Sequence, residues 1–160
     1  MDPLFPTRSS QQAFALDHFL ILMNQRGFSC QRSKTKDLIY TFSHPIHKKT
    51  LAKLSQDKQG RVQLWLRFSA SSNFSEHFMA CLIKTLEEDD YKYVGCYPHC
   101  SECDPPIGYV VQSPKGPFFR CHKELIQVGE IDEVPFEETL ALIDAQHRFE
   151  TLEKKNKVRN

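Results

Sequence analysis

The stretch "TLAKLSQDKQGRVQLWLRFS", residues 50–69, decides the fold class of this chain. In its second half an apolar residue stands at every other position: Val62, Leu64, Leu66 and Phe68. Side chains of a strand point alternately to its two faces, so this pattern predicts a β-strand with one buried face. The turn formers Asp57 and Gly60 separate it from a second β-prone run at about Thr50–Ser55. The stretch therefore predicts an antiparallel hairpin.

Further strand segments lie on both sides of this hairpin. Short β-prone runs precede it at Phe28–Gln31 and Leu38–Ser43. Downstream, Ile107–Gln112 and Phe118–Cys121 flank the breaker-rich "SPKGP", which predicts a second hairpin. The runs "YKYVG" and "ELIQV" are additional strand candidates. Together these segments predict an antiparallel sheet.

Three segments have the apolar periodicity and the terminal signals of helices. The first, residues 9–27, opens on a serine–glutamine capping pair and ends at a glycine. The second, residues 73–91, opens on Asn73 and should stop near its acidic end, because those charges oppose the helix dipole. The third, residues 134–160, has a proline at its start and a basic tail that should fray from about residue 154.

Length and composition are those of one globular domain. A chain of 160 residues can bury roughly two-thirds of its unfolded surface, so it does not need cross-links in order to fold. Its 40% apolar and 26% charged residues are ordinary for a soluble protein, and no linker or repeat interrupts it. We expect a single α+β domain over residues 1–160, with an antiparallel sheet and about three helices.

The sequence carries no signal for a membrane or for export. No apolar run approaches the roughly eighteen residues of a spanning helix, which argues against a membrane partner. The start, "MDPLFPTRSSQQ", lacks the basic, apolar and small-residue regions of a secretory signal, so we expect a cytoplasmic protein. In a reducing compartment, clustered cysteines indicate metal or redox chemistry before stable disulfides.

The cysteine cluster is the strongest functional signal. The segment "CYPHCSEC" contains Cys96, Cys100 and Cys103, and Cys121 follows in "FFRCHKEL". Two cysteines separated by two residues can offer both thiolates to one ion, and the return of the second hairpin should bring Cys121 toward Cys103. We therefore predict a structural zinc bound by these four thiolates, in a knuckle and hairpin element at about residues 94–122. His99 and His122 are reserve ligands.

Other uses of the same cysteines remain open. A C-x2-C pair is also the spacing of dithiol redox sites, although no βαβ unit precedes it here. The C-x3-C-x2-C spacing resembles the cluster motif of radical SAM enzymes, a family that implies a large partial barrel after the motif. Only 57 residues follow Cys103, and that resemblance gives Cys121 no role. Simple packing is the last alternative.

The remaining cysteines and one histidine pair are interpreted as structural. Cys81 falls on the apolar face of the second predicted helix and Cys30 in a predicted strand, so both should pack as small hydrophobes. His44 and His47 stand three residues apart in "SHPIHKK". Because Pro45 argues against a helix and no third ligand is near in sequence, we interpret this segment as a surface loop.

Charge is distributed unevenly along the chain. Residues 1–70 contain eleven Lys and Arg against four Asp and Glu, whereas residues 71–160 contain ten against sixteen. The basic first half could bind nucleic acid if its aromatics stacked on bases. The candidate residues for this are Arg32, Lys34, Lys36, Lys48 and Lys49. The alternative is that the two halves pack together and neutralise each other.

The function indicated by the sequence is that of a small metal-binding domain whose zinc is structural, acting as a binding or regulatory module. It contains no glycine-rich phosphate loop and no nucleophile or zinc-protease motif, so an enzyme is the less favoured interpretation. The alternatives are a thiol-redox or metal-dependent enzyme that uses the same cysteines, and a nucleic-acid binder. A partner, if there is one, is a protein or a nucleic acid.

Overall fold

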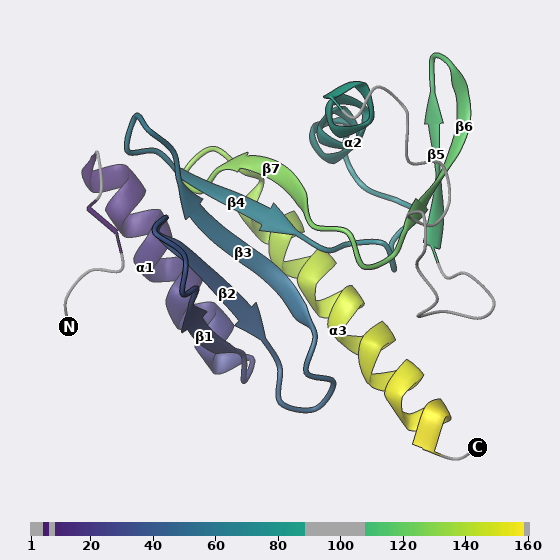
Figure 1. The fold of residues 1–160 in the computed structure, drawn as a ribbon, viewed down its shortest axis with the longest axis horizontal. Helices are drawn as coiled ribbons and strands as arrows, with labels where there is room; N and C mark the ends of the chain where they lie inside the picture. The colour runs from purple at the N-terminus through teal and green to yellow at the C-terminus, as the bar shows by residue number, and fades with distance from the viewer. Residues whose placement is uncertain (1–4, 7–8, 89–107, 159–160) are drawn as a thin grey trace.

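The computed structural model describes residues 5–6, 9–88 and 108–158, which form a single α+β domain (Figure 1). Its described part contains three helices and seven strands. In chain order they are α1 (Ser10–Gln25), β1 (Ser29–Arg32), β2 (Ile39–Ser43), β3 (Thr50–Gln56), β4 (Val62–Leu66), α2 (Glu76–Glu88), β5 (Gly108–Ser113), β6 (Gly116–Cys121), β7 (Ile126–Glu130) and α3 (Phe136–Val158).

Five strands form one antiparallel sheet in the order β1-β2-β3-β4-β7. The predicted hairpin is its centre: β3 pairs with β4, and Leu54 lies opposite Leu64. The turn forms as its residues suggest, because Asp57 Oδ1 accepts hydrogen bonds from the N–H groups of Gln59 and Arg61 (both 2.9 Å). Gly60 follows with φ +78°, a left-handed conformation that glycine adopts without strain. These local interactions fix the register of the two central strands.

Helices α1 and α3 cover one face of this sheet, and Figure 1 shows both behind the strands. They run side by side in the same direction, because His18 stacks on Phe136 and Arg26 pairs with Asp144 (2.9 Å). Phe19 of α1 meets the edge of the Phe42 ring in β2. The main core lies between these two layers.

The first helix has the ends that the sequence predicts. Ser9 caps it by accepting a hydrogen bond from the N–H of Gln12 (3.1 Å). At the other end Gly27 has φ +79°, and the Phe28 N–H reaches back to the Met23 carbonyl (3.0 Å). Both terminal signals are thus confirmed.

The two edge strands of the five-stranded sheet differ in exposure. β7 is covered by α2, from which His77 donates a hydrogen bond to the Val128 carbonyl (2.7 Å). All four residues of β1, at the opposite edge, are exposed. An aromatic cluster of Phe68, Phe74 and Phe78 anchors α2 to the end of the central hairpin.

Two helix boundaries differ from the sequence expectation. The first helical bond of α2 runs from the Met79 N–H to the Ser75 carbonyl, so the helix begins after Ser75 and not after Asn73. The reason is tertiary, because the Ser75 N–H is bonded to Glu138 of α3 (2.7 Å). The basic tail expected to fray from about residue 154 is helical as far as Val158.

The second predicted hairpin is present as a separate two-stranded sheet, β5 and β6. Its turn is closed by Ser113, whose Oγ donates to the Gly116 carbonyl (3.0 Å). The segment "YKYVG" and the knuckle at 96–103 lie outside the described residues. Among the helices that are described, none has both the length and the apolar character needed to cross a membrane.

Candidate functional site

Cys121 ends β6 and is the predicted zinc ligand that falls within the described residues. It is buried, and the register of the second hairpin pairs it with Gly108. A Cβ at Gly108 would lie 2.1 Å from the Arg120 carbonyl oxygen, so only glycine fits there. The Cys121 Sγ accepts a weak hydrogen bond from the Lys123 N–H (3.5 Å). This places an N–H donor on the sulfur, as in the surroundings of metal-bound thiolates.

The other three predicted ligands, Cys96, Cys100 and Cys103, lie outside the described residues together with His99. The four-cysteine site is therefore not shown. Of the cysteines expected to pack, Cys81 is half-buried against the Val128 carbonyl, and burial raises the pKa of its thiol. Cys30 differs from the expectation, because β1 is an edge strand and leaves it exposed.

The residues around Cys121 are held by buried polar contacts. Arg120 is almost fully buried and forms an ion pair with Glu124, in which Nε lies 2.9 Å from Oε2. The ring of His122 packs against Phe149 of α3, and its carbonyl accepts a hydrogen bond from Ser69 Oγ (2.9 Å). Cys121 and His122 thus have different neighbours.

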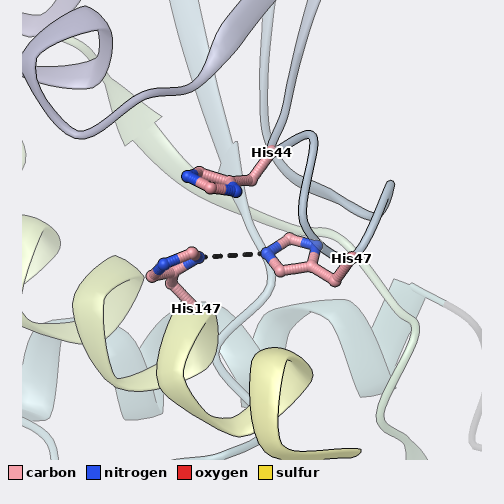
Figure 2. Close-up of side chains that lie close together, drawn as sticks. All are labelled: His44, His47 and His147. Carbon is pink, nitrogen blue, oxygen red and sulfur yellow. Dashed lines mark hydrogen bonds between the residues drawn. The ribbon is translucent and has the colours of Figure 1, made fainter. Parts of the chain in front are cut away.

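A cluster of three histidines is the site that the sequence did not predict. His44 directly follows β2, His47 lies in the loop to β3, and His147 comes from α3 (Figure 2). The interpretation of "SHPIHKK" as a surface loop is wrong for both of its histidines: His44 is 8% exposed and His47 is 6% exposed. One nitrogen of each ring lies within 4.8 Å of the others.

The hydrogen bonds define the ring tautomers. Nδ1 of His44 accepts from the Ile46 N–H (3.2 Å), and Nδ1 of His47 accepts from the Lys49 N–H (3.1 Å). A neutral ring whose Nδ1 accepts must carry its proton on Nε2. Nε2 of His47 therefore donates to Nδ1 of His147, 3.1 Å away.

Burial and mutual repulsion favour the neutral forms of His47 and His147. Burial is the largest cause that lowers the pKa of His47, to about 4, and the neighbouring His147 lowers it further. The pKa of His147 is lowered by burial and then by His44. Near neutral pH these two imidazoles are neutral, which is the form that binds metals.

A buried charged pair lies beside the histidines. Arg67, just after β4, and Glu150 of α3 are 9% and 4% exposed, and Nη1 lies 3.6 Å from Oε1. Glu150 also accepts from Gln146 Nε2 (3.1 Å). Burial lowers the pKa of Arg67, whereas the charges of Glu150 and Cys121 raise it. Arg67 thus lies within electrostatic reach of both Cys121 and His47.

The nucleic-acid alternative loses its aromatic component. Arg32, Lys34, Lys36 and Lys48 are exposed and Lys49 is half-buried. The nearby aromatics are in the core, with Phe28, Tyr40 and Phe42 at most 9% exposed. Bases could not stack on these rings, so the basic residues alone would provide only phosphate contacts.

A polar groove of about 340 Å³ runs between α2 and the β4–β7 edge. Four of its charged side chains form two ion pairs: Arg61 with Glu130 (3.2 Å) and Lys84 with Glu88 (3.8 Å). This pairing is typical of a solvated surface network and provides no pointer to catalysis.

Comparisons of the chain with models of protein families, with curated proteins and with solved structures found no significant match.

Proposed function

We propose that this chain is a small metal-binding domain in which Cys96, Cys100, Cys103 and Cys121 bind one structural zinc ion. Four thiolates fill the tetrahedral shell of zinc and leave no open position for a substrate or an activated water. The domain would therefore act as a binding or regulatory module and not as an enzyme. A reducing, cytoplasmic environment would keep the thiols available for the metal.

The observation that carries the proposal is the register of the second hairpin. Cys121 lies opposite Gly108, and Gly108 is only five residues after Cys103 in the chain. The hairpin thus returns the fourth cysteine to the end of β5 that follows the other three. The connection of four residues is short, so little chain entropy would be lost in closing the site.

The surroundings of Cys121 fit a thiolate ligand. A thiolate in a buried position needs hydrogen-bond donors and positive charge nearby. The Lys123 N–H is such a donor, and the buried guanidinium of Arg67 lies within electrostatic reach. The neighbouring His122 packs on Phe149, which favours the sulfur over the imidazole as the ligand at this point.

The test is a metal and thiol count on protein purified under reducing conditions without added metal. Cys121→Ser should remove about one zinc per chain and lower the melting temperature, because binding energy at a structural site is folding energy. Cys30→Ser is the matched control, since Cys30 is exposed on the far edge of the sheet. It should leave the zinc content and the melting temperature unchanged.

Two results would overturn the proposal. One is a Cys121→Ser variant that retains the zinc content and melting temperature of the parent. The other is a parent protein without metal whose thiols cycle reversibly between oxidised and reduced states, which would identify the cysteines as a redox site. If Cys121→Ser fails to fold, the parent can be unfolded with a chelator and should refold when zinc is restored.

A further inference from the structure

The three histidines come from two distant parts of the chain. His44 and His47 belong to the β2–β3 connection, and His147 lies 100 residues after His47 on α3. Figure 2 shows the three rings facing one another, with His44 above the bonded pair. The ring centroids of His44 and His147 are 4.3 Å apart, and those of His47 and His147 are 5.2 Å apart. Packing of the core alone would not require three imidazole rings at one point.

From this convergence we propose that His44, His47 and His147 form a second metal site, which takes a divalent transition-metal ion such as zinc, nickel or cobalt. It is separate from the proposed cysteine site and does not depend on it. Imidazole nitrogen suits these ions, whereas magnesium and calcium prefer oxygen ligands. A set of three histidines leaves at least one coordination position open to water or another ligand.

The distances are close to those of a coordinated set. Two nitrogens bound to one tetrahedral zinc at about 2.0 Å are roughly 3.3 Å apart. The His47 Nε2 to His147 Nδ1 distance of 3.1 Å already matches this value. The nitrogens lie at most 4.8 Å apart, so closure needs only small side-chain rotations. The lowered pKa values keep the rings of His47 and His147 neutral at pH 7, which makes their lone pairs available.

Metal binding would move the ring proton of His47, and also that of His44 if the ion binds its Nε2. His47 Nε2 carries the proton that it shares with His147, so the ion can bind there only after that proton moves to Nδ1. The bond from the Lys49 N–H to Nδ1 must then open. The Lys49 amide is therefore a local reporter of occupancy that a binding event elsewhere would not change.

An ion at this site would cross-link the β2–β3 connection to α3. The two elements already meet where Lys154 donates to the Ile46 carbonyl. His147 is only half-buried, which gives an ion a route from solvent. An occupied site would thus stabilise the position of the C-terminal half of α3 against the sheet. Through this cross-link, metal binding would regulate the surface that the β2–β3 connection and α3 form.

The experiment is a titration of the full chain, as purified, with Co²⁺ near pH 7.5. One equivalent should bind with visible d–d bands and without the sulfur-to-cobalt charge-transfer absorption of a thiolate site. His147→Gln should weaken binding at least tenfold, because it removes one of three ligands. His18→Gln is the matched control: it removes an exposed histidine of α1 and should change the affinity less than twofold. Mg²⁺ should not bind.

A second readout protects the test against a variant that fails to fold. In the parent protein, Co²⁺ should broaden the ring proton resonances of these three histidines and shift the Lys49 amide. Binding with unchanged affinity in His147→Gln, or broadening confined to other histidines, would overturn the proposal. The absence of Co²⁺ binding at millimolar concentration would overturn it too.

Discussion

Neutralising Glu150 should strongly destabilise the domain. The Glu150→Gln substitution keeps the size of the side chain and its acceptor for Gln146, but it removes the negative charge that faces Arg67. Both side chains are buried, and Nε and Nη1 of Arg67 have no hydrogen-bond partner within the described part of the chain. The substitution would therefore leave a buried cation for which, among the described residues, Cys121 is the remaining group that raises its pKa.

The size of the effect follows from the geometry of the pair. At 3.6 Å and an effective dielectric constant of about 20, two unit charges attract by roughly 4 to 5 kcal/mol. Breaking a buried pair by removing one partner typically costs about 3 to 5 kcal/mol. Because this pair is longer than an ideal ion pair, we expect a loss near the lower end, about 3 kcal/mol. In a chain of this length that corresponds to a melting temperature lower by roughly 6 to 12 °C.

The assay is urea unfolding at pH 7.5, with the double variant Arg67→Met and Glu150→Gln as the control. Removing both charges takes away the unpaired cation, so the double variant should lie within about 1 kcal/mol of the parent. A loss below about 1 kcal/mol in Glu150→Gln would show that Arg67 does not depend on this carboxylate. A double variant as unstable as the single one would mean that packing, and not charge, is what the substitution disturbs.

Two further predictions concern the histidine cluster. Gly27→Ala should destabilise the protein by about 1 kcal/mol more than Gly60→Ala in thermal unfolding. The angle φ is positive at both glycines, but a Cβ at Gly27 would also lie 3.0 Å from His44 Nε2. Equal losses of stability in the two variants would contradict this contact. With exchangeable metal removed, the lowered pKa of His47 means that the unfolded chain takes up a proton as the pH falls through about 6.5, whereas the folded protein does so only near 4. This ring's contribution to stability is thus complete above pH 6.5, and about 2 kcal/mol of it should be lost by pH 5, relative to His47→Gln; parallel pH curves for the two proteins would refute the assignment.

The fold was predictable where local interactions decide it. The Asp57–Gly60 turn and the alternation in β4 are contained in a few adjacent residues, and so are the Ser9 cap and the Gly27 stop of α1. The start of α2 was not, because Ser75 is bonded to Glu138 on a helix far along the chain. Sequence patterns report local preferences, and a tertiary hydrogen bond can shift a helix boundary by a fraction of a turn.

The histidine cluster was missed for the same reason. His44 and His47 were visible as a pair, but their partner is 100 residues away and no short motif joins them. One signal was present: His147 stands four residues after Ile143, a spacing that places it toward the buried side of α3. The position of Cys121 was easier to anticipate, because the turn at "SPKGP" fixes the hairpin register.

The exposed edge strand β1 has a consequence for the protein in concentrated solution. An unpaired edge can add a strand from a second molecule, and this is a common start of aggregation. Here Arg32 lies at the end of β1, and Lys34 and Lys36 follow within four residues, all of them exposed. Two copies that approached edge to edge would bring these like charges together. We therefore expect these basic residues to disfavour edge-to-edge association of two copies.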